Sequence, residues 1–339
     1  MSEAHVLTRR DALRLGVGLM GGALLAGCRN AAERRPLAIA NASGGLITTM
    51  AQLMRQQRFL EATGMPFEVF DVADGSKILG GIVGGSIDVS LMSGIAHVFP
   101  AIERGADLKV IGGAILQPAL ALYTAHDTIT SLRDLEGRVV GSGSVGALIH
   151  LLTVALLRQA GVDPAKVQFA NIGSSADVFR ATVAGKIDAG VGPASFAADP
   201  SRFGLRLIEG GNMAESLSQF TYSAAWTSTQ AIAERREDLV KALAAYATLY
   251  RFVQRPEAEP DFLRARTEVF PQAPQDEHLA EFQFIQKYRP FASELVLEPE
   301  RLDYLQRLNV EAGSQQEILP FERVADMSLA AEALTLVNR

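Results

Sequence analysis

The feature that most constrains the fold of this chain is a weak internal repeat with an offset of about 100 residues. The motif Gly-x-Ile-Asp occurs at residues 85–88 and again at residues 185–188, so that Asp88 and Asp188 occupy matching positions. An apolar segment precedes each motif, PFEVFDV from Pro66 and KVQFANI from Lys166. A repeat of this length predicts two structurally similar halves, in which the two aspartates pin the start of equivalent strands.

Each half alternates predicted strands with predicted helices. A buried strand, a Gly/Ser turn and a helix that ends at a glycine are indicated twice, in residues 37–64 and in residues 138–161. A further matching strand follows in each half, DLKVIGG from Asp107 and LRLIEGG from Leu205. This alternation predicts an α/β fold, with two doubly wound, mostly parallel sheets that form two lobes.

The chain must cross between these lobes. We expect the crossings in two extended segments, residues 120–125 and 222–227. The boundaries that follow are residues 36–121 plus 226–339 for lobe one and residues 122–225 for lobe two. From Ala233 onward the pattern is almost entirely helical, and it predicts a helical C-terminal region with helices near residues 235–254, 258–269, 276–287, 298–311 and 322–336.

A ligand site is expected between the lobes, because ligands bind beyond the carboxyl ends of the strands in open α/β sheets. Free amides and hydroxyls at the helix starts there could hold a carboxylate, a sulfonate or a polar ring edge. The alternative is that these serines and glycines only cap the helices. The candidate contacts are Asn41, Ser43, Gly44, Gly45, Asp74, Ser93 and Gly94 in lobe one, Ser142, Gly143, Ser144, Val145, Ser174, Gly192 and Pro193 in lobe two, and Trp226 near a crossing.

The glycine-rich turn at residues 141–146 also fits the pattern G-x-G-x-x-G of dinucleotide-binding sites. Such a site needs an acidic residue at the end of the following strand, where this chain has Asn171 and Gly173. We therefore expect no nucleotide cofactor. The predicted cleft loops are nearly free of charge, which favours a neutral or singly anionic ligand with an apolar or aromatic body.

The N-terminus has the pattern of a bacterial export signal. Residues 8–14 read TRRDALR and resemble a twin-arginine motif, and an uncharged run of 13 residues follows, too short to span a membrane. The run ends in Leu25-Ala26-Gly27-Cys28, which resembles a lipobox. We expect residues 1–27 to be a signal peptide, Cys28 to carry a lipid, and residues 28–35 to be a linker. An ordinary signal peptide with an incidental cysteine is the alternative.

The sequence shows no catalytic or metal-binding pattern. Its five histidines are scattered without metal-ligand spacing, a G-x-S-x-G turn is missing, and Cys28 is the only cysteine. The formal net charge of −6 argues against a nucleic-acid partner. We therefore expect a protein that is not an enzyme and that holds no metal.

Residues 131–168, from SLRDLEG to AKVQ, and residues 181–196, ATVAGKIDAGVGPASF, together resemble the second lobe of the SsuA/THI5-like (NMT1-type) periplasmic solute-binding proteins. The resemblance spans roughly residues 36–255. It implies a type II periplasmic binding protein with a hinge between its lobes, which closes on a small organic solute such as a sulfonate, an aromatic carboxylate or a pyrimidine.

The resemblance also implies an ABC permease and its ATPase as partners, and a location in the periplasm, with the lipid as membrane anchor. A monomer is sufficient for this role. Two alternatives stay open. The first is a sensory receptor that docks on a membrane signalling protein. The second is a pyrimidine-biosynthesis enzyme on the same scaffold, although the cysteine-rich motif of that enzyme is absent from this sequence.

Overall fold

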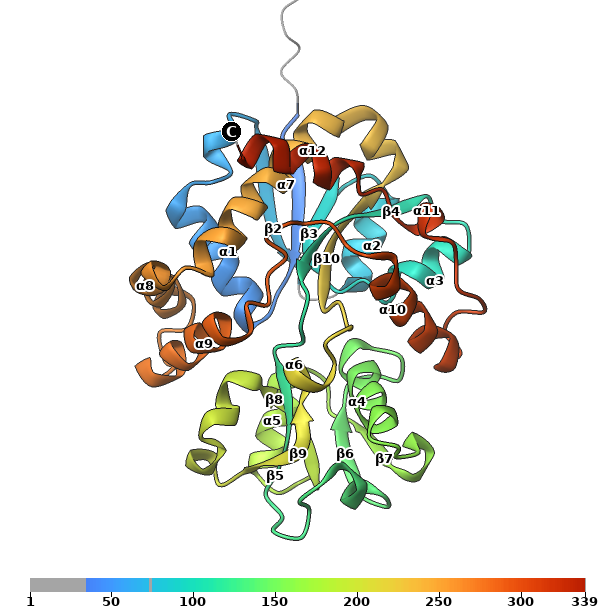
Figure 1. The fold of residues 1–339 in the computed structure, drawn as a ribbon, viewed down its shortest axis with the longest axis vertical. Coiled ribbons are helices and arrows are strands. Elements are labelled where there is room, and N and C mark those ends of the chain that lie inside the picture. The colour runs from blue at the N-terminus through green and yellow to red at the C-terminus, as the bar shows by residue number, and fades with distance from the viewer. Residues whose placement is uncertain (1–34, 73–74, 339) are drawn as a thin grey trace, which may run out of the picture. The chain divides into compact units, whose positions relative to one another are not determined.

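The computed structural model describes residues 35–72 and 75–338, and these residues contain two five-stranded sheets (Figure 1). The predicted signal peptide, the lipidation site Cys28 and the candidate contact Asp74 lie outside the described residues. We call the first sheet with its helices lobe one, and the second sheet with its helices lobe two. The α/β class and the two-lobed fold predicted from the repeat are confirmed.

The first sheet has the strand order β2-β1-β3-β10-β4. Strand β1 runs parallel to β2 and β3, whereas β10 runs antiparallel to both β3 and β4. Every residue of β3 is buried, which shows that both faces of this part of the sheet are covered. The strands are β1 (Leu37–Ala42), β2 (Phe67–Val72), β3 (Val89–Ser93), β4 (Leu108–Ile115) and β10 (Ser223–Ser228).

The second sheet repeats this arrangement with the strand order β7-β6-β8-β5-β9. Strand β6 runs parallel to β7 and β8, and β5 runs antiparallel to β8 and β9. Strands β7, β6, β8 and β9 occupy the positions of β2, β1, β3 and β4, as the repeat predicts, and β5 occupies the position of β10. The strands are β5 (Leu120–Thr124), β6 (Val139–Ser142), β7 (Gln168–Asn171), β8 (Ala189–Pro193) and β9 (Arg206–Asn212).

The predicted crossings lie a few residues too late in the sequence. Residues 120–124 form β5 inside the second sheet, and residues 223–228 form β10 inside the first. The chain therefore passes between the sheets at residues 116–119 and again at residues 217–222. The reason is that LALYT in β5 is buried at every position, as suits an inner strand rather than a connection.

Helices flank both sheets, and α12 lies beside the long helix α7 over the first sheet (Figure 1). The helices of the repeat are α1 (Gly45–Gln57), α2 (Gly75–Val83), α3 (Val98–Glu103), α4 (Leu148–Gln159), α5 (Ser175–Val183) and α6 (Met213–Ser216). The C-terminal helices are α7 (Thr229–Val253), α8 (Glu259–Val269), α9 (Gln275–Tyr288), α10 (Pro299–Glu311), α11 (Phe321–Val324) and α12 (Ser328–Val337).

The last predicted helix, at residues 322–336, is two helices. Ala325 has an extended backbone and bridges to Val110 of β4, and the amide of Asp326 donates to the Val110 carbonyl at 2.9 Å. The Asp326 carboxylate then accepts from the amide of Ser328, where α12 begins. Pairing with a distant strand therefore breaks a segment whose local pattern favours a continuous helix.

The two repeated aspartates hold equivalent strands together. The amide of Asp88 donates to the Ala38 carbonyl at 2.9 Å, and its carboxylate accepts from the Ala38 amide at 2.8 Å. Asp188 makes the same pair of bonds with Val139, at 2.9 and 2.8 Å. Asp88 also receives two hydrogen bonds from Arg35, at 2.6 and 2.7 Å. The predicted structural role of both aspartates is confirmed.

We expect Asp88→Ala to lower the free energy of unfolding by about 3 kcal/mol, because it leaves a buried amide without its acceptor and removes the partner of Arg35. Asp188→Ala is the matched variant, and we expect a smaller loss because its side chain is 23% exposed, against 5% for Asp88. Urea unfolding of the three proteins measures both values. Equal losses in the two variants would contradict this account.

Candidate functional site

A cavity of about 220 Å³ lies at the carboxyl ends of strands from both sheets, and we call it the central cavity. From lobe one it is lined by the turn after β1 and by Gly94, directly after β3. Pro193, at the end of β8, and Ser175, at the start of α5, line it from lobe two. Residues of both crossings, Ala119 and Tyr222, complete the wall. The cavity therefore lies where the repeat predicts the ligand site.

The N-terminus of α1 supplies hydrogen-bond donors to the central cavity. Gly44 caps this helix without a side chain, and the amide of Thr48 makes the first helical bond to the Gly44 carbonyl at 2.7 Å. The amides of Gly45, Leu46 and Ile47 therefore have no partner within the helix. All three residues line the cavity. Together with the helix dipole, these amides favour a negatively charged group.

Five of the predicted contact residues line the central cavity: Ser43, Gly44, Gly45, Gly94 and Pro193. The predicted Ser174 lies next to the lining residue Ser175, and its hydroxyl accepts from the amide of Asp177 at 3.2 Å. This bond makes Ser174 the N-cap of α5. The alternative reading of the serines, as helix caps, therefore applies to Ser174.

Four other predicted contacts have their polar atoms inside the protein. Asn41 donates to the Tyr246 hydroxyl at 2.9 Å, and the hydroxyl of Ser142 donates to a backbone carbonyl. The indole of Trp226 donates to the Ser93 hydroxyl at 2.7 Å. All four side chains are 0% exposed. In this structure they bond to the protein interior and do not line the central cavity.

The glycine-rich turn of lobe two lies outside the lining of the central cavity, and Leu148 of α4 takes its place. Ser144 accepts a hydrogen bond from Asn171 at 3.3 Å, next to Gly143, and Val145 is 81% exposed. Gly192 has a packing role, because a Cβ atom there would approach the Phe179 ring to 2.3 Å. The small residue allows β8 to contact α5.

Two charged residues line the central cavity that were not predicted from the sequence, Arg266 of α8 and Glu281 of α9. Their side chains are joined by an ion pair at 3.5 Å, and Arg266 also donates to the Thr49 hydroxyl at 3.1 Å. The loops are nearly uncharged as predicted, but these helices bring charge into the site. The sequence contains one indication that Arg266 is buried. Arg266 follows the buried Phe262 by four residues, and therefore lies on the same face of the helix.

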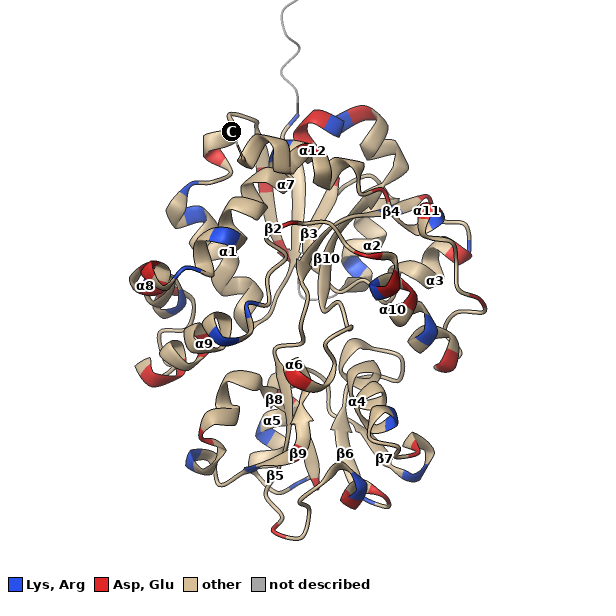
Figure 2. Cartoon of the chain, in the orientation of Figure 1, with Lys and Arg blue, Asp and Glu red and all other residues tan. Residues whose placement is uncertain are grey.

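Charge is otherwise concentrated on the helices and outer loops, as Figure 2 shows. The inner strands β3, β5, β8 and β10 contain no Lys, Arg, Asp or Glu. Burial and the nearby Glu281 carboxylate raise the pKa of Tyr222 to about 12. Tyr222 therefore stays a neutral hydrogen-bonding group in the wall of the central cavity, beside the Arg266–Glu281 pair.

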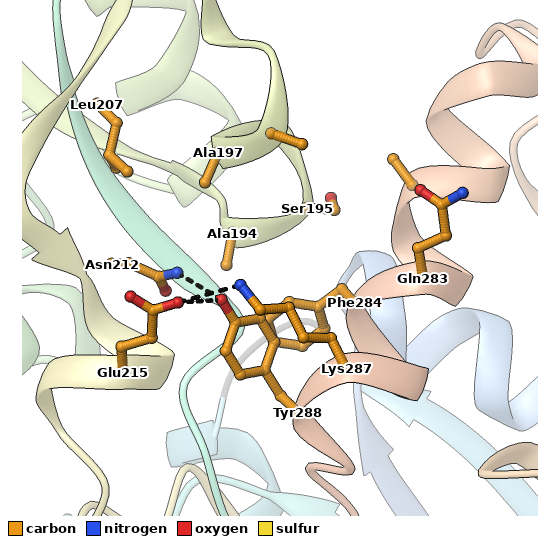
Figure 3. Close-up of a pocket in the computed structure, with 12 residues that line it drawn as sticks. Ala194, Ser195, Ala197, Leu207, Asn212, Glu215, Gln283, Phe284, Lys287 and Tyr288 are labelled. Atoms are coloured by element: carbon orange, nitrogen blue, oxygen red, sulfur yellow. Dashed lines mark hydrogen bonds and ion pairs between the residues drawn. The ribbon is translucent and has the colours of Figure 1, made fainter.

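Figure 3 shows a second cavity, of about 400 Å³, which we call the lateral cavity. It adjoins the central cavity, since Ala194 and Ala280 in its lining are the chain neighbours of Pro193 and Glu281. It is enclosed by the short helix at Ala194–Ala198, by β9 and α6, and by α9. At one end Asn212 donates to the Tyr288 hydroxyl at 2.9 Å, and both Tyr288 and Lys287 donate to Glu215. The Tyr288 hydroxyl and then Lys287 lower the pKa of Glu215, which is therefore ionised at neutral pH.

Within residues 35–72 and 75–338, no cluster of three His, Cys, Asp or Glu side chains could hold a metal ion. In the same residues, none of the helices is both long and apolar enough to span a bilayer.

Comparison with known proteins identifies the family. The model of the NMT1/THI5-like family matches residues 55–256. The chain belongs to this family. A comparison with curated protein sequences gives no match.

Solved structures confirm the periplasmic binding protein fold of this NMT1/THI5-like protein. The periplasmic aliphatic sulphonate binding protein SsuA from Escherichia coli is 19% identical, with a TM-score of 0.69 over 86% of this chain and 92% of its own. The alkanesulfonate-binding SsuA from Xanthomonas axonopodis pv. citri, bound to MOPS, is 19% identical, with a TM-score of 0.68 over 89% of this chain and 99% of its own. The desulfurization enzyme DSZB is 14% identical, with a TM-score of 0.60 over 89% of this chain and 100% of its own.

The pH dependence of stability tests the environment of His278, which is buried on α9. Burial, and then the charge of Arg266, lower its pKa below the usual value of 6.5. The unfolded chain therefore binds a proton more readily than the folded chain below about pH 6.5. We expect stability to fall from pH 7 to pH 5, and His278→Gln to reduce this slope. An unchanged slope in urea unfolding of the variant would refute the assignment.

Proposed function

We propose that this protein is the solute-binding component of an ABC importer, and that it captures a small organic anion in the central cavity. The observation that carries the proposal is the joint presence there of the free amides at the start of α1 and of Arg266. Both favour negative charge, and both lie at the strand ends where the two sheets meet. Membership of the NMT1/THI5-like family supports the same role.

The ligand is expected to carry a single negative charge and an apolar body. Glu281 offsets part of the charge of Arg266, so that the cavity does not favour a dianion. Leu46, Ile47, Leu120 and Leu148 supply apolar walls. A carboxylate or a sulfonate fits this combination, and the sulphonate-binding relative from Escherichia coli supports the latter. A neutral pyrimidine would leave the amides and Arg266 without an anionic partner.

Capture requires that ligand contacts be better in the closed protein than in the open one. The central cavity meets this condition, because its lining comes from both lobes and from both crossings. Rotation at residues 116–119 and 217–222 would separate the two halves of the lining. The closed form would then present its surface to the permease and to the associated ATPase.

The cellular setting belongs to the same proposal. Export by a twin-arginine signal, cleavage before Cys28 and attachment of a lipid would hold a monomeric receptor at the membrane in the periplasm. A sensory receptor would need the same cavity, and docking on a signalling protein instead of a permease would distinguish it.

The fold leaves room for an enzyme, since DSZB shares it. The central cavity of this chain is lined by no cysteine, and the only cysteine, Cys28, lies in the predicted lipobox. Binding without turnover is our proposal. Formation of a product from a bound ligand over time would refute it and would favour an enzyme, of pyrimidine biosynthesis or another reaction.

Thermal unfolding against a ligand panel tests the proposed function. The panel contains sulfonates, aromatic and aliphatic carboxylates, pyrimidines, amino acids and nitrate, added to protein refolded from denaturant. A ligand at 100 times its dissociation constant adds about 2.7 kcal/mol of stability, which raises the midpoint by several degrees. We expect shifts from singly charged organic anions. Shifts from pyrimidines alone, or from no anion in the panel, would contradict the proposed ligand class.

Gly94→Leu should abolish most of this binding. A Cβ atom at Gly94 lies 3.8 Å from the Tyr222 carbonyl and 4.0 Å from Leu148, so that a longer side chain would fill the central cavity without a backbone clash. If the larger side chain costs about 2 kcal/mol of binding free energy, the affinity is weaker by roughly thirtyfold. Gly80→Leu on α2, where no atom lies within 4 Å, is the control. Wild-type affinity in Gly94→Leu would place the ligand elsewhere.

A further inference from the structure

The central and lateral cavities adjoin at a hydrogen-bonded contact between Ser195 and Glu281. Ala194 of the lateral cavity directly follows Pro193 of the central cavity, and Ala280 directly precedes Glu281. The hydroxyl of Ser195, which lines the lateral cavity, donates to the Glu281 carboxylate at 3.0 Å. We call this bond the shared wall. A ligand group that passed between Ser195 and Glu281 would reach from one cavity into the other.

Glu281 has a second hydrogen-bond donor within reach of the shared wall, the guanidinium of Arg266. The oxygen of Glu281 that accepts from Ser195 is 3.5 Å from the guanidinium of Arg266. Charged pairs of this kind usually approach to about 2.7–2.9 Å. A small rotation of the carboxylate toward Arg266 would exchange the Ser195 bond for a shorter charged one. The Glu281 carboxylate therefore keeps Arg266 as a partner when the Ser195 bond is broken.

The lateral cavity has the chemistry of a site for apolar groups. Beyond Ser195, apolar side chains of Ala194, Ala197, Leu207 and Phe284 line it (Figure 3), together with Ala280. The polar groups at its outer end are bonded to one another, through the contacts of Tyr288 with Asn212 and Glu215. Its volume of about 400 Å³ is within the usual range for small-molecule sites. Gln283 also lines the cavity, and this residue is exposed.

We propose that the lateral cavity receives the apolar body of the ligand, while the anionic head lies in the central cavity at α1 and Arg266. The ligand class is then an elongated organic anion with a flexible apolar tail. This inference rests on the proposed function, because it needs the head group in the central cavity. It adds a second compartment, whose size selects among anions with the same head.

Affinity measured by calorimetry across a chain-length series tests the inference. The probes are the linear alkanesulfonates from ethanesulfonate to octanesulfonate and the linear carboxylates with the same chain lengths. Each is used below its critical micelle concentration. Burial of each added methylene should raise the affinity about fourfold once the tail enters the lateral cavity. Equal affinity along the series would overturn the inference and leave the proposed function intact. Absence of binding by every member of both series would count against the proposed function itself.

Substitution of a lateral-cavity residue locates the tail. Ala280→Trp should lower the affinity for octanesulfonate to that for ethanesulfonate, with the short ligand unaffected, because the indole occupies the space of the tail. Ala331→Trp on α12 is the control, since the same substitution there is exposed and lies outside both cavities. An equal loss for short and long ligands, or no loss for either, would overturn the assignment of the tail.

Ser195→Ala tests the shared wall. The variant lacks the Ser195–Glu281 hydrogen bond, which must break before a tail can enter the lateral cavity. Long ligands should therefore bind several-fold more tightly, and short ligands with unchanged affinity. An unchanged affinity for octanesulfonate, or the same change for ethanesulfonate, would show that a tail does not pass between Ser195 and Glu281. The Ala280→Trp result remains interpretable in either case, because it depends only on the space in the lateral cavity.

Discussion

A carboxylate at the start of the third strand of each repeat fixes the geometry on which the site depends. Asp88 and Asp188 each close a two-bond ring with the backbone of the neighbouring strand, at Ala38 and Val139. These rings set the register of β3 against β1 and of β8 against β6. In the first sheet the register then shifts between Ala40 and Asn41, so that Asn41 pairs with Met92. The strands that follow Asp88 and Asp188 lead to Gly94 and Pro193 in the lining of the central cavity.

Much of the fold could be predicted because it is encoded locally. Buried strands and amphipathic helices leave short-range patterns, and the recurrence of Gly-x-Ile-Asp places these patterns in two equivalent sets. The errors arose where a distant segment decides the local structure. Residues 325–327 interrupt a helical pattern because Ala325 pairs with β4. Residues 120–124 were predicted as a connection because nothing local shows that β5 lies between β8 and β9.

The site could be predicted only in part, for two physical reasons. Glycine and serine have structural uses that the sequence cannot separate from binding: Gly192 makes room for Phe179, and Ser174 caps α5, whereas Gly44 and Gly45 expose backbone to the cavity. The charges of the site lie on α8 and α9, outside the repeat. Arg266 and Glu281 sit among many charged residues of similar helices, and only tertiary packing distinguishes them from solvated ones.

The placement of β5 and β10 bears on the order in which the two lobes can be completed during synthesis. All five strands of the second sheet come from one continuous stretch, residues 120–212. The first sheet lacks β10, which separates β3 from β4, until residues 223–228 have been made. The first sheet therefore stays incomplete, with the facing edges of β3 and β4 unpaired, until the ribosome has added the more than one hundred residues between β4 and β10. The later half of the repeat can reach its native sheet before the earlier half.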